Sequence, residues 1–251
     1  MVKNKKILAL IPTRLNSRRL PAKALLPINN LPLIIHVYRR TLLSKMVDDA
    51  IICCDDKKIL NVAKKHGAKA MLTSKHHQNG TDRICEAYKR IKKKYQLIVD
   101  VQGDEPLLSP VHVDKVINFH LKNQNIDIVL PNLKVKPTNN TNIVKIVSNK
   151  KNEVLYISRA NIPYEFRSRV KYFKKHLSIV SFKPESLIKF GQSKRSDIEK
   201  TEDIELLRAL DIGMNIKTLS LTGDSFSIDI FEDYAKAQAQ FSKDKYFKFY
   251  K

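Results

Sequence analysis

The 251-residue chain has few cysteines, no long apolar run, no internal repeat and no Gly/Ser-rich linker. Its three cysteines, of which Cys53 and Cys54 are adjacent, have the spacing of neither a disulfide framework nor a metal site. No apolar stretch reaches the roughly 18 residues that a membrane-spanning helix needs. The apolar run over residues 6–12 is followed by Arg14 and lacks a small-residue cleavage site, so it predicts a buried strand and not a signal peptide. We therefore expect a cytoplasmic protein in a reducing compartment, with no membrane partner.

Acidic residues are scarce beside basic ones: 25 Asp and Glu against 47 Lys and Arg give a formal net charge of +22. The basic residues are mostly lysines spread along the whole chain, and they form no basic helix register and no zinc-finger spacing. We interpret them as a solvated surface that attracts anionic ligands, and we expect no nucleic-acid partner. Hydrophobic residues make up 43% of the chain, which is enough for a core and excludes disorder.

Apolar runs and helical patterns alternate along the first half of the chain. Strands are predicted at residues 6–12, 50–54, 69–73 and 96–101, and helices at 32–43, 56–66, from about 81 and from about 110. This alternation predicts an α/β fold with a mostly parallel, Rossmann-like sheet and helices on both faces.

From residue 126 to about 182 the pattern is β-rich, and we interpret this segment as an insertion or lid on a single domain that spans residues 1–251. It includes one strand predicted over residues 176–182. The remaining predicted elements are helices at 184–190, 201–213 and 230–242 and a strand at 216–221.

A basic loop, residues 13–23, directly follows the first predicted strand. Its cations and hydroxyl are Arg14, Ser17, Arg18, Arg19 and Lys23. Arginine forks and a lysine point charge at a strand end favour an anion site for phosphate. The loop has no Gly-rich turn, so it is neither a Walker loop nor a dinucleotide fingerprint. The alternative is a solvated basic loop.

Two aspartates are candidate ligands for a hard cation. Asp104 follows the fourth predicted strand, and Asp229 follows an alternating stretch before the last predicted helix. Mg²⁺ prefers one or two carboxylates together with phosphate oxygens. Each aspartate has the alternative role of a helix N-cap.

The loop over residues 76–83 offers amide, hydroxyl and backbone donors before a helix, a set that suits the edge of a nucleobase. We interpret its adjacent histidines, His76 and His77, as surface residues and not as metal ligands.

These segments, in this order and at these spacings, resemble the 3-deoxy-manno-octulosonate cytidylyltransferases (CMP-Kdo synthetases). The resemblance spans residues 5–240 and rests on the segments IPTRLNSRRLPAK, HQNGTDR, VQGDEP, YISRANIP, HLSI, EDIELLRAL and SIDIFED. It implies a nucleotidyltransferase fold, a reaction of CTP with a 3-deoxy-2-keto sugar acid that releases pyrophosphate, and Mg²⁺ as cofactor. It also implies a homodimer formed through the β-rich segment.

The resemblance assigns roles residue by residue. Arg14, Ser17, Arg19 and Lys23 would hold the CTP phosphates, with Arg19 and Lys23 stabilising charge in the transition state. Asp104 and Asp229 would bind Mg²⁺. The rest of the nucleotide site would comprise Thr13, Gln78, Asn79, Gly80, Thr81, Arg83 and Gln102. Arg159, His176 and Glu205 would bind the sugar, with the respective alternatives of a surface cation, a core histidine and a solvated helix face.

The chain departs from the family pattern at several positions. Ala22 replaces a glycine, and Val180 and Leu206 stand where polar sugar contacts are expected. Lost hydrogen-bond partners change the preferred sugar, so we expect Kdo or a modified relative as substrate. The alternatives are activation of another acid sugar, such as a nonulosonic acid, and a non-catalytic protein that binds anions or nucleic acid.

Overall fold

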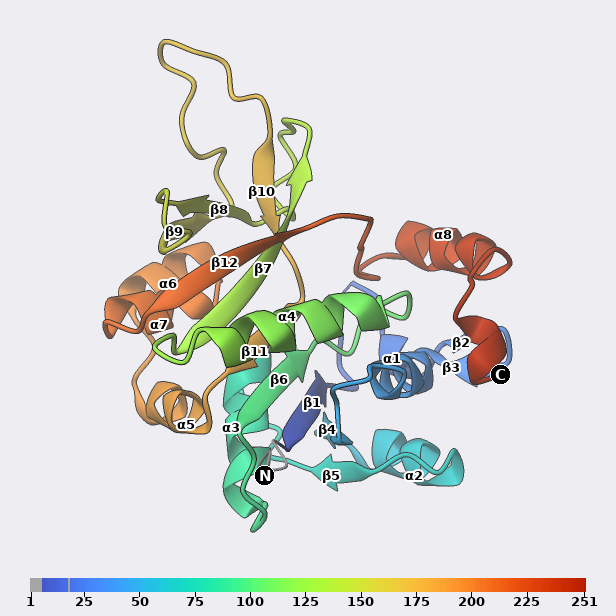
Figure 1. Ribbon diagram of the computed structural model, residues 1–251. Coiled ribbons are helices and arrows are strands. Elements are labelled where there is room, and N and C mark those ends of the chain that lie inside the picture. Colours follow the sequence, from blue (N-terminus) through green and yellow to red (C-terminus); the bar gives the residue numbers. More distant parts are fainter. Residues whose placement is uncertain (1–5, 18) are drawn as a thin grey trace. The chain divides into compact units, whose positions relative to one another are not determined.

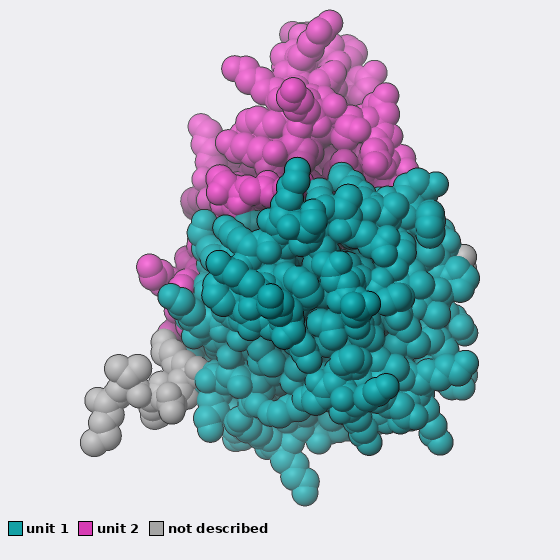
Figure 2. Space-filling view, turned by 90° about the vertical axis from the view of Figure 1, so that its right-hand side faces the viewer, with its two compact units in different colours: residues 1–115, 225–251 teal, residues 116–224 magenta. Residues whose placement is uncertain are grey.

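The computed structural model describes residues 6–17 and 19–251, so Arg18 of the basic loop lies outside the described residues. The chain forms two compact units, coloured separately in Figure 2. Unit 1 extends to residue 115 and includes residues 225–251, and unit 2 comprises residues 116–224. Within the described part of the chain, no helix combines the length and the apolar character needed to cross a membrane.

Unit 1 contains strands and helices in alternation (Figure 1). They are β1 (Ile7–Thr13), η1 (Lys23–Leu25), β2 (Pro27–Ile28), β3 (Leu31–Pro32), α1 (Leu33–Leu42), β4 (Asp49–Cys54), α2 (Lys57–Lys65), β5 (Ala70–Leu72), α3 (Gly80–Arg90), β6 (Leu97–Val101), the start of α4 (Pro110–Lys122), α8 (Phe231–Phe241) and η2 (Phe247–Phe249). The β2–β3 hairpin and the two 3-10 turns are elements that the sequence pattern does not predict.

Strands β5, β4, β1 and β6 of unit 1 pair in parallel in that order. The chain moves from β1 to β4 and β5 in one direction and then crosses back to β6 on the far side of β1. Because such crossovers are right-handed, α1 and α2 cover one face and α3 covers the other, as Figure 1 shows. The predicted parallel α/β sheet is confirmed. The order in which strands are added to the sheet reverses at β1, between β4 on one side and β6 on the other. Ligands of such sheets bind beyond the carboxyl ends of the strands at that switch point.

Helix ends in this unit follow the sequence signals. The Asp56 carboxylate accepts a hydrogen bond of 2.7 Å from the backbone N–H of Lys58 and so caps α2. Gly67, two residues after the helix, has φ +71°, a conformation that costs glycine little. Asn79 caps α3 by accepting from the N–H of Asp82 at 2.8 Å. Local side-chain chemistry therefore fixes where these helices begin and end.

Unit 2 is built around the long strand β7. Its elements are the rest of α4, β7 (Ile128–Val135), β8 (Lys145–Ser148), β9 (Val154–Ser158), β10 (Phe173–His176), β11 (Ile179–Phe182), α5 (Pro184–Gln192), α6 (Asp197–Glu202), α7 (Leu206–Asp211) and β12 (Ile216–Leu221). β12 pairs in parallel with β7, whereas β10 and β11 pair antiparallel with it. The β-rich pattern predicted from residue 126 is therefore present.

The single strand predicted over residues 176–182 is wrong, because two strands share this stretch. β10 ends at His176 and β11 begins at Ile179, and both lie along β7. Pro131 of β7 lies opposite the break, where its carbonyl accepts from Leu177 at 3.1 Å. Proline has no N–H to donate, so the ladder is interrupted there.

The single helix predicted over residues 201–213 is also wrong. α6 ends at Glu202, the next residue Asp203 has a left-handed φ of +51°, and α7 starts at Leu206. The guanidinium of Arg159 donates to the carbonyls of Glu202 at 2.7 Å and Asp203 at 3.0 Å. A cation bonded to the last carbonyls of a helix stabilises its end, so a residue distant in the sequence supports this break.

A buried ion pair joins these two short helices. Arg208 of α7 donates to both oxygens of Glu199 of α6, at 2.7 and 2.8 Å, and neither residue is more than 1% exposed. Burial alone would raise the pKa of Glu199, but Arg208 and Arg195 outweigh burial and lower it. The pair therefore stabilises the fold at neutral pH, and its contribution is lost as the pH falls through the depressed pKa.

Replacing Arg208 alone should be strongly destabilising. Arg208→Met leaves a buried carboxylate without its bidentate partner, and we expect the free energy of unfolding to fall by about 3–5 kcal/mol. Urea denaturation measures this loss. The matched control is Lys200→Met, since Lys200 pairs with the 97%-exposed Asp197; its loss should be within about 1 kcal/mol. Equal losses in the two variants would contradict the prediction.

Candidate active site

A lysine and two aspartates from three distant segments meet in unit 1. Lys23, at the start of η1, places its Nζ atom 2.9 Å from Asp104 Oδ2 and 3.2 Å from Asp229 Oδ1. The same ammonium donates to the carbonyl of Ile228 at 2.6 Å. Arg19 adds a second cation, with Nη2 3.0 Å from Asp229 Oδ1. The structure thus brings together the four residues predicted to be catalytic.

The charges of this cluster affect one another strongly because it is partly buried. Lys23 is 16% exposed, and Asp104 and Asp229 are 26% and 28% exposed. Burial alone would lower the pKa of Lys23, but the two carboxylates outweigh burial and raise the pKa above its usual value. Lys23 is therefore a full positive charge at neutral pH.

Neither aspartate caps a helix, which was the alternative role for both. Helix α4 begins at Pro110, six positions after Asp104. At the start of α8, the carboxylate of Asp233 accepts from the N–H groups of Asp229 and Ile230 at 3.0 and 3.2 Å. Asp233 therefore does the capping, which leaves the Asp229 carboxylate to face Lys23 and Arg19.

Two glycines bring the strand-end loops into close contact. A Cβ on Gly103 would lie 2.7 Å from the backbone oxygen of Pro12 and 3.2 Å from Thr13 Cβ. A Cβ on Gly80 would lie 3.1 Å from the amide of Gln102. The loop after β6, the end of β1 and the start of α3 therefore touch at the switch point of the sheet, and the predicted nucleotide residues Thr13, Gly80 and Gln102 lie together.

Arg83, predicted to bind nucleotide, has its contacts inside the protein. It is 3% exposed and donates to Thr73 Oγ1 at 2.7 Å and to the Ser74 carbonyl at 3.1 Å. Its guanidinium also lies 3.8 Å from Asp55. These contacts join α3 to the ends of β4 and β5, so Arg83 positions the start of α3, which includes Thr81, and the preceding loop with Gln78 and Asn79. Asn79 itself caps α3 through its side-chain oxygen.

The basic loop is held at its base by Asp55, a residue that the sequence analysis did not identify. Asp55 accepts a hydrogen bond of 2.9 Å from the N–H of Leu15, whose carbonyl accepts from Ser17 and Ala22 at 3.1 Å each. The Asp56 carboxylate alone caps α2, which leaves Asp55 for this second role. No side-chain pattern in the sequence indicates it. Arg14 is exposed.

A tyrosine and a histidine, neither of which the sequence analysis identified, hold strand β2, which follows Lys23. Tyr234 of α8 donates its hydroxyl to the Pro27 carbonyl at 2.5 Å. His36 of α1 bonds through Nε2 to the Ile28 carbonyl at 2.8 Å. Burial lowers the pKa of His36 to about 4, so its ring is neutral. Because α8 begins just after Asp229, Tyr234 ties the Asp229 segment to the Lys23 segment.

The residues predicted to bind the sugar belong to unit 2. Arg159 also donates to the Thr141 carbonyl at 3.3 Å, so its contacts with carbonyls use three of its five N–H donors. His176 ends β10, and its pKa is lowered to about 4 by burial and by the charges of Lys175 and Arg159. Glu205 is half-buried at the start of α7, two positions from Asp203. Arg159 is thus both a helix-capping residue and a neighbour of His176. The apolar replacements Val180 and Leu206 are both buried.

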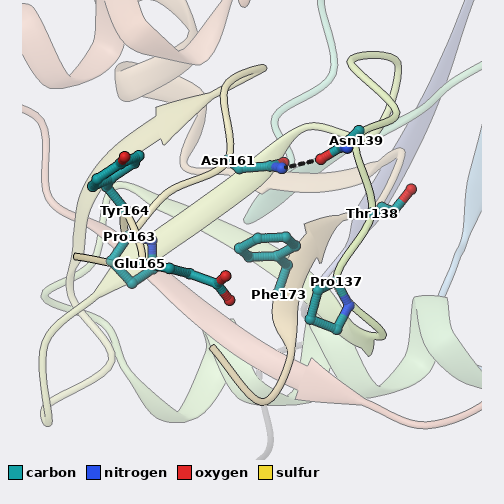
Figure 3. Close-up of a pocket in the computed structure, with 8 residues that line it drawn as sticks. All are labelled: Pro137, Thr138, Asn139, Asn161, Pro163, Tyr164, Glu165 and Phe173. Atoms are coloured by element: carbon teal, nitrogen blue, oxygen red, sulfur yellow. Dashed lines mark hydrogen bonds between the residues drawn. The ribbon is translucent and has the colours of Figure 1, made fainter. Parts of the chain in front are cut away.

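A cavity of about 290 Å³ also lies in unit 2 (Figure 3). Asn161 donates to Asn139 at 2.9 Å on its wall, and Phe173 and Glu165 point toward it. Of the lining residues that the structure describes, none is Arg159, His176 or Glu205. The described lining of the cavity therefore does not include the three predicted sugar contacts.

Known proteins share this chain's sequence and fold. A family model described as cytidylyltransferase matches residues 8–216. The 3-deoxy-manno-octulosonate cytidylyltransferase of a Nitratiruptor species is 38% identical over 92% of this chain and 98% of its own length. The enzyme of the same name from Thermodesulfovibrio yellowstonii is 37% identical over 92% of this chain and 96% of its own.

This chain belongs to the CMP-Kdo synthetase family. A solved structure of CMP:2-keto-3-deoxy-manno-octonic acid synthetase complexed with CTP has a TM-score of 0.89 to it, at 28% identity and with 95% and 99% of the two chains covered. The chain is therefore a CTP-dependent cytidylyltransferase. The alternative of a non-catalytic binding protein is set aside.

One departure from the family pattern lies beside Lys23. Ala22 has φ +52°, in the left-handed region, and donates its N–H to the Leu15 carbonyl while its own carbonyl accepts from Leu25 at 2.8 Å. A residue with a Cβ costs roughly 1–2 kcal/mol in this conformation. The turn that carries Lys23 thus demands what glycine supplies most readily, and this chain achieves it with alanine.

Substitutions of Ala22 should separate backbone strain from chain entropy. Ala22→Gly relieves the strain but makes the unfolded chain more flexible, so the free energy of unfolding should change by less than about 1 kcal/mol. Ala22→Val should lower it by about 2 kcal/mol, because β-branched residues tolerate a positive φ poorly. Urea denaturation of both variants measures this order. A glycine variant less stable than the valine variant would contradict the assigned conformation.

Proposed function

We propose that this protein transfers CMP from CTP to the anomeric hydroxyl of Kdo, with release of pyrophosphate, and so supplies activated Kdo for lipopolysaccharide synthesis. The observation that carries this is the cluster of Lys23, Arg19, Asp104 and Asp229 at the switch point of a cytidylyltransferase sheet. In the reaction the sugar hydroxyl attacks the α-phosphorus, and the bond to pyrophosphate breaks.

The cations of the basic loop do the electrostatic part of this transfer. Arg14, Ser17, Arg19 and Lys23 bind the triphosphate, and Arg19 and Lys23 neutralise charge that builds on the α-phosphate and the leaving pyrophosphate. Phosphoryl-type transfer depends mainly on positioning and charge stabilisation, so fixed cations at the strand end suit it. Residues 78–81, with Thr13 and Gln102, hold the cytosine and ribose, and Arg83 positions that loop.

Members of this family typically use a divalent metal. The described residues contain no group of three or more His, Cys, Asp or Glu side chains that could hold one, so a site would rest on fewer protein ligands. Asp104 and Asp229 fit Mg²⁺, which binds through one or two carboxylates plus substrate phosphates. When bound there, Mg²⁺ would lower the pKa of the attacking hydroxyl and neutralise phosphate charge.

Arg159, His176 and Glu205 bind the sugar acid. The Arg159 guanidinium supplies positive charge for the carboxylate of Kdo. His176 is neutral at pH 7, since its pKa is about 4, so it bonds to sugar hydroxyls as a neutral ring. Glu205 accepts from hydroxyls. The buried Val180 and Leu206 favour a substrate range that includes Kdo relatives with fewer polar groups, and a nonulosonic acid is the second candidate substrate.

Pyrophosphate release from CTP should require Kdo or a related sugar acid, Mg²⁺ and Asp104. With Asp104→Asn we expect kcat to fall by roughly 100-fold or more, because one charge of the cluster is removed. The control is Asp197→Asn, whose carboxylate is 97% exposed in unit 2, and its rate should match the unchanged protein. A panel of Kdo, amino- and deoxy-substituted ulosonic acids and nonulosonic acids identifies the substrate. No turnover with any of them would refute the proposal.

The homodimer expected through residues 126–182 is a further proposal. In the connection between β9 and β10, Tyr164 and Phe166 are each 82% exposed. Large exposed aromatics close together in the sequence favour a protein contact. A second copy of the chain is the partner we propose.

Sedimentation velocity tests this assembly. We expect a dimer at micromolar concentration and a monomer for the double variant Tyr164→Ser, Phe166→Ser, because the aromatic contact area is lost. Phe249→Ser is the control, since Phe249 is 65% exposed in unit 1 and lies outside the β-rich segment. The proposal fails if the unchanged protein sediments as a monomer or if both variants remain dimeric.

A further inference from the structure

Lys23 bonds to the same two carboxylates that suit the metal. Its ammonium makes three contacts, with Asp104, Asp229 and the Ile228 carbonyl, at 2.9, 3.2 and 2.6 Å. An ammonium has three N–H donors and a compact positive charge, so it binds to oxygen atoms as a small metal cation does. Lys23 thus satisfies Asp104 and Asp229 from within the chain.

We infer that Lys23 is a built-in counter-ion that competes with the divalent metal for Asp104 and Asp229 until the phosphates of CTP draw its ammonium away. This inference rests on the proposed metal role of the two aspartates. It adds a coupling between metal and nucleotide: each makes room for the other, and by linkage each raises the affinity for the other.

The charges around the cluster support this exchange. Two carboxylates close together repel each other, so the partly buried pair needs a cation. Of the two aspartates, Arg19 contacts Asp229, at 3.0 Å, whereas Lys23 contacts both. Removing Lys23 therefore leaves the pair under-neutralised, and adding a metal while Lys23 stays would put two cations in one place.

The side chain of Lys23 is also suited to having two alternative partners. Its ammonium ends a flexible four-carbon stem, while its backbone is fixed by hydrogen bonds of the η1 turn, with its N–H 3.2 Å from the Leu20 carbonyl and its carbonyl 3.1 Å from the Leu26 N–H. The charged group can move from carboxylates to phosphates without a change in the fold. The basic loop that binds the triphosphate is the same loop that carries Lys23.

Binding of Mn²⁺ alone, with no CTP, tests the inference on the full-length protein. Electron paramagnetic resonance of free Mn²⁺ gives the dissociation constant. Because one competing unit charge is removed, Lys23→Met should bind Mn²⁺ at least about ten-fold more tightly than the unchanged protein. Lys23→Arg keeps the charge and should bind Mn²⁺ as weakly as the unchanged protein.

A control lysine variant and a double variant distinguish failure of the counter-ion role from failure of the metal role. Lys69→Met removes one lysine from a different carboxylate in unit 1, Asp49, and should leave Mn²⁺ affinity unchanged. Lys23→Met combined with Asp104→Asn should lose the gain. If this double variant binds Mn²⁺ as tightly as Lys23→Met, the metal role of Asp104 is refuted. If Asp104→Asn weakens binding but Lys23→Met does not tighten it, only the counter-ion role is refuted.

Thermal unfolding covers the case in which Lys23→Met folds poorly. With Arg19 left as the one cation beside its two carboxylates, this variant should melt at a lower temperature than the unchanged protein, and millimolar Mn²⁺ should recover most of the difference by binding the folded state. The unchanged protein and Lys69→Met should gain little from Mn²⁺. Equal Mn²⁺ shifts in all three proteins would overturn the inference.

Discussion

One ammonium shared by two carboxylates is the interaction on which the candidate active site of this protein depends. Lys23, Asp104 and Asp229 belong to segments separated by at least 81 positions, and only the order of the strands brings them together. The close approach of Gly103 to Pro12 sets the distance between the first two segments. Tyr234, bonded to Pro27, sets the third against the first. Uncharged contacts, namely the approach of Gly103 to Pro12 and the hydrogen bond of Tyr234 to Pro27, therefore position the charged residues of the cluster.

Much of unit 1 could be predicted because its signals are local. The apolar run of β1, the cap at Asp56 and the glycine at position 67 each determine an element within a few residues. Right-handed crossovers then leave little choice of topology, and the reversal of direction beside β1 places the loops of interest at one edge. The proximity of Asp104 and Asp229 could be predicted only from this topology together with the family resemblance. The residues next to each aspartate in the sequence do not indicate that the two lie together.

What could not be predicted depends on partners distant in the sequence. The break between β10 and β11 lies opposite Pro131, and the break between α6 and α7 is capped by Arg159, some 40 positions earlier. Asp55, His36 and Tyr234 bond to backbone groups, so no pattern of side chains reveals them. Arg83 shows the opposite case, because its motif indicated a ligand contact and its guanidinium is bonded within the protein.

Net charge and local charge have different consequences here. A net charge of +22 draws anions toward the whole surface, yet Arg19 and Lys23 are balanced at the site by Asp104 and Asp229. In this balanced cluster each charge has an opposite neighbour before any substrate binds. In the proposed exchange, a nucleoside triphosphate with its metal adds charges of both signs, and each charge of the cluster keeps an opposite neighbour. Selectivity for such a substrate would then come from the geometry of these charge pairs, which lysines spread over the surface do not supply.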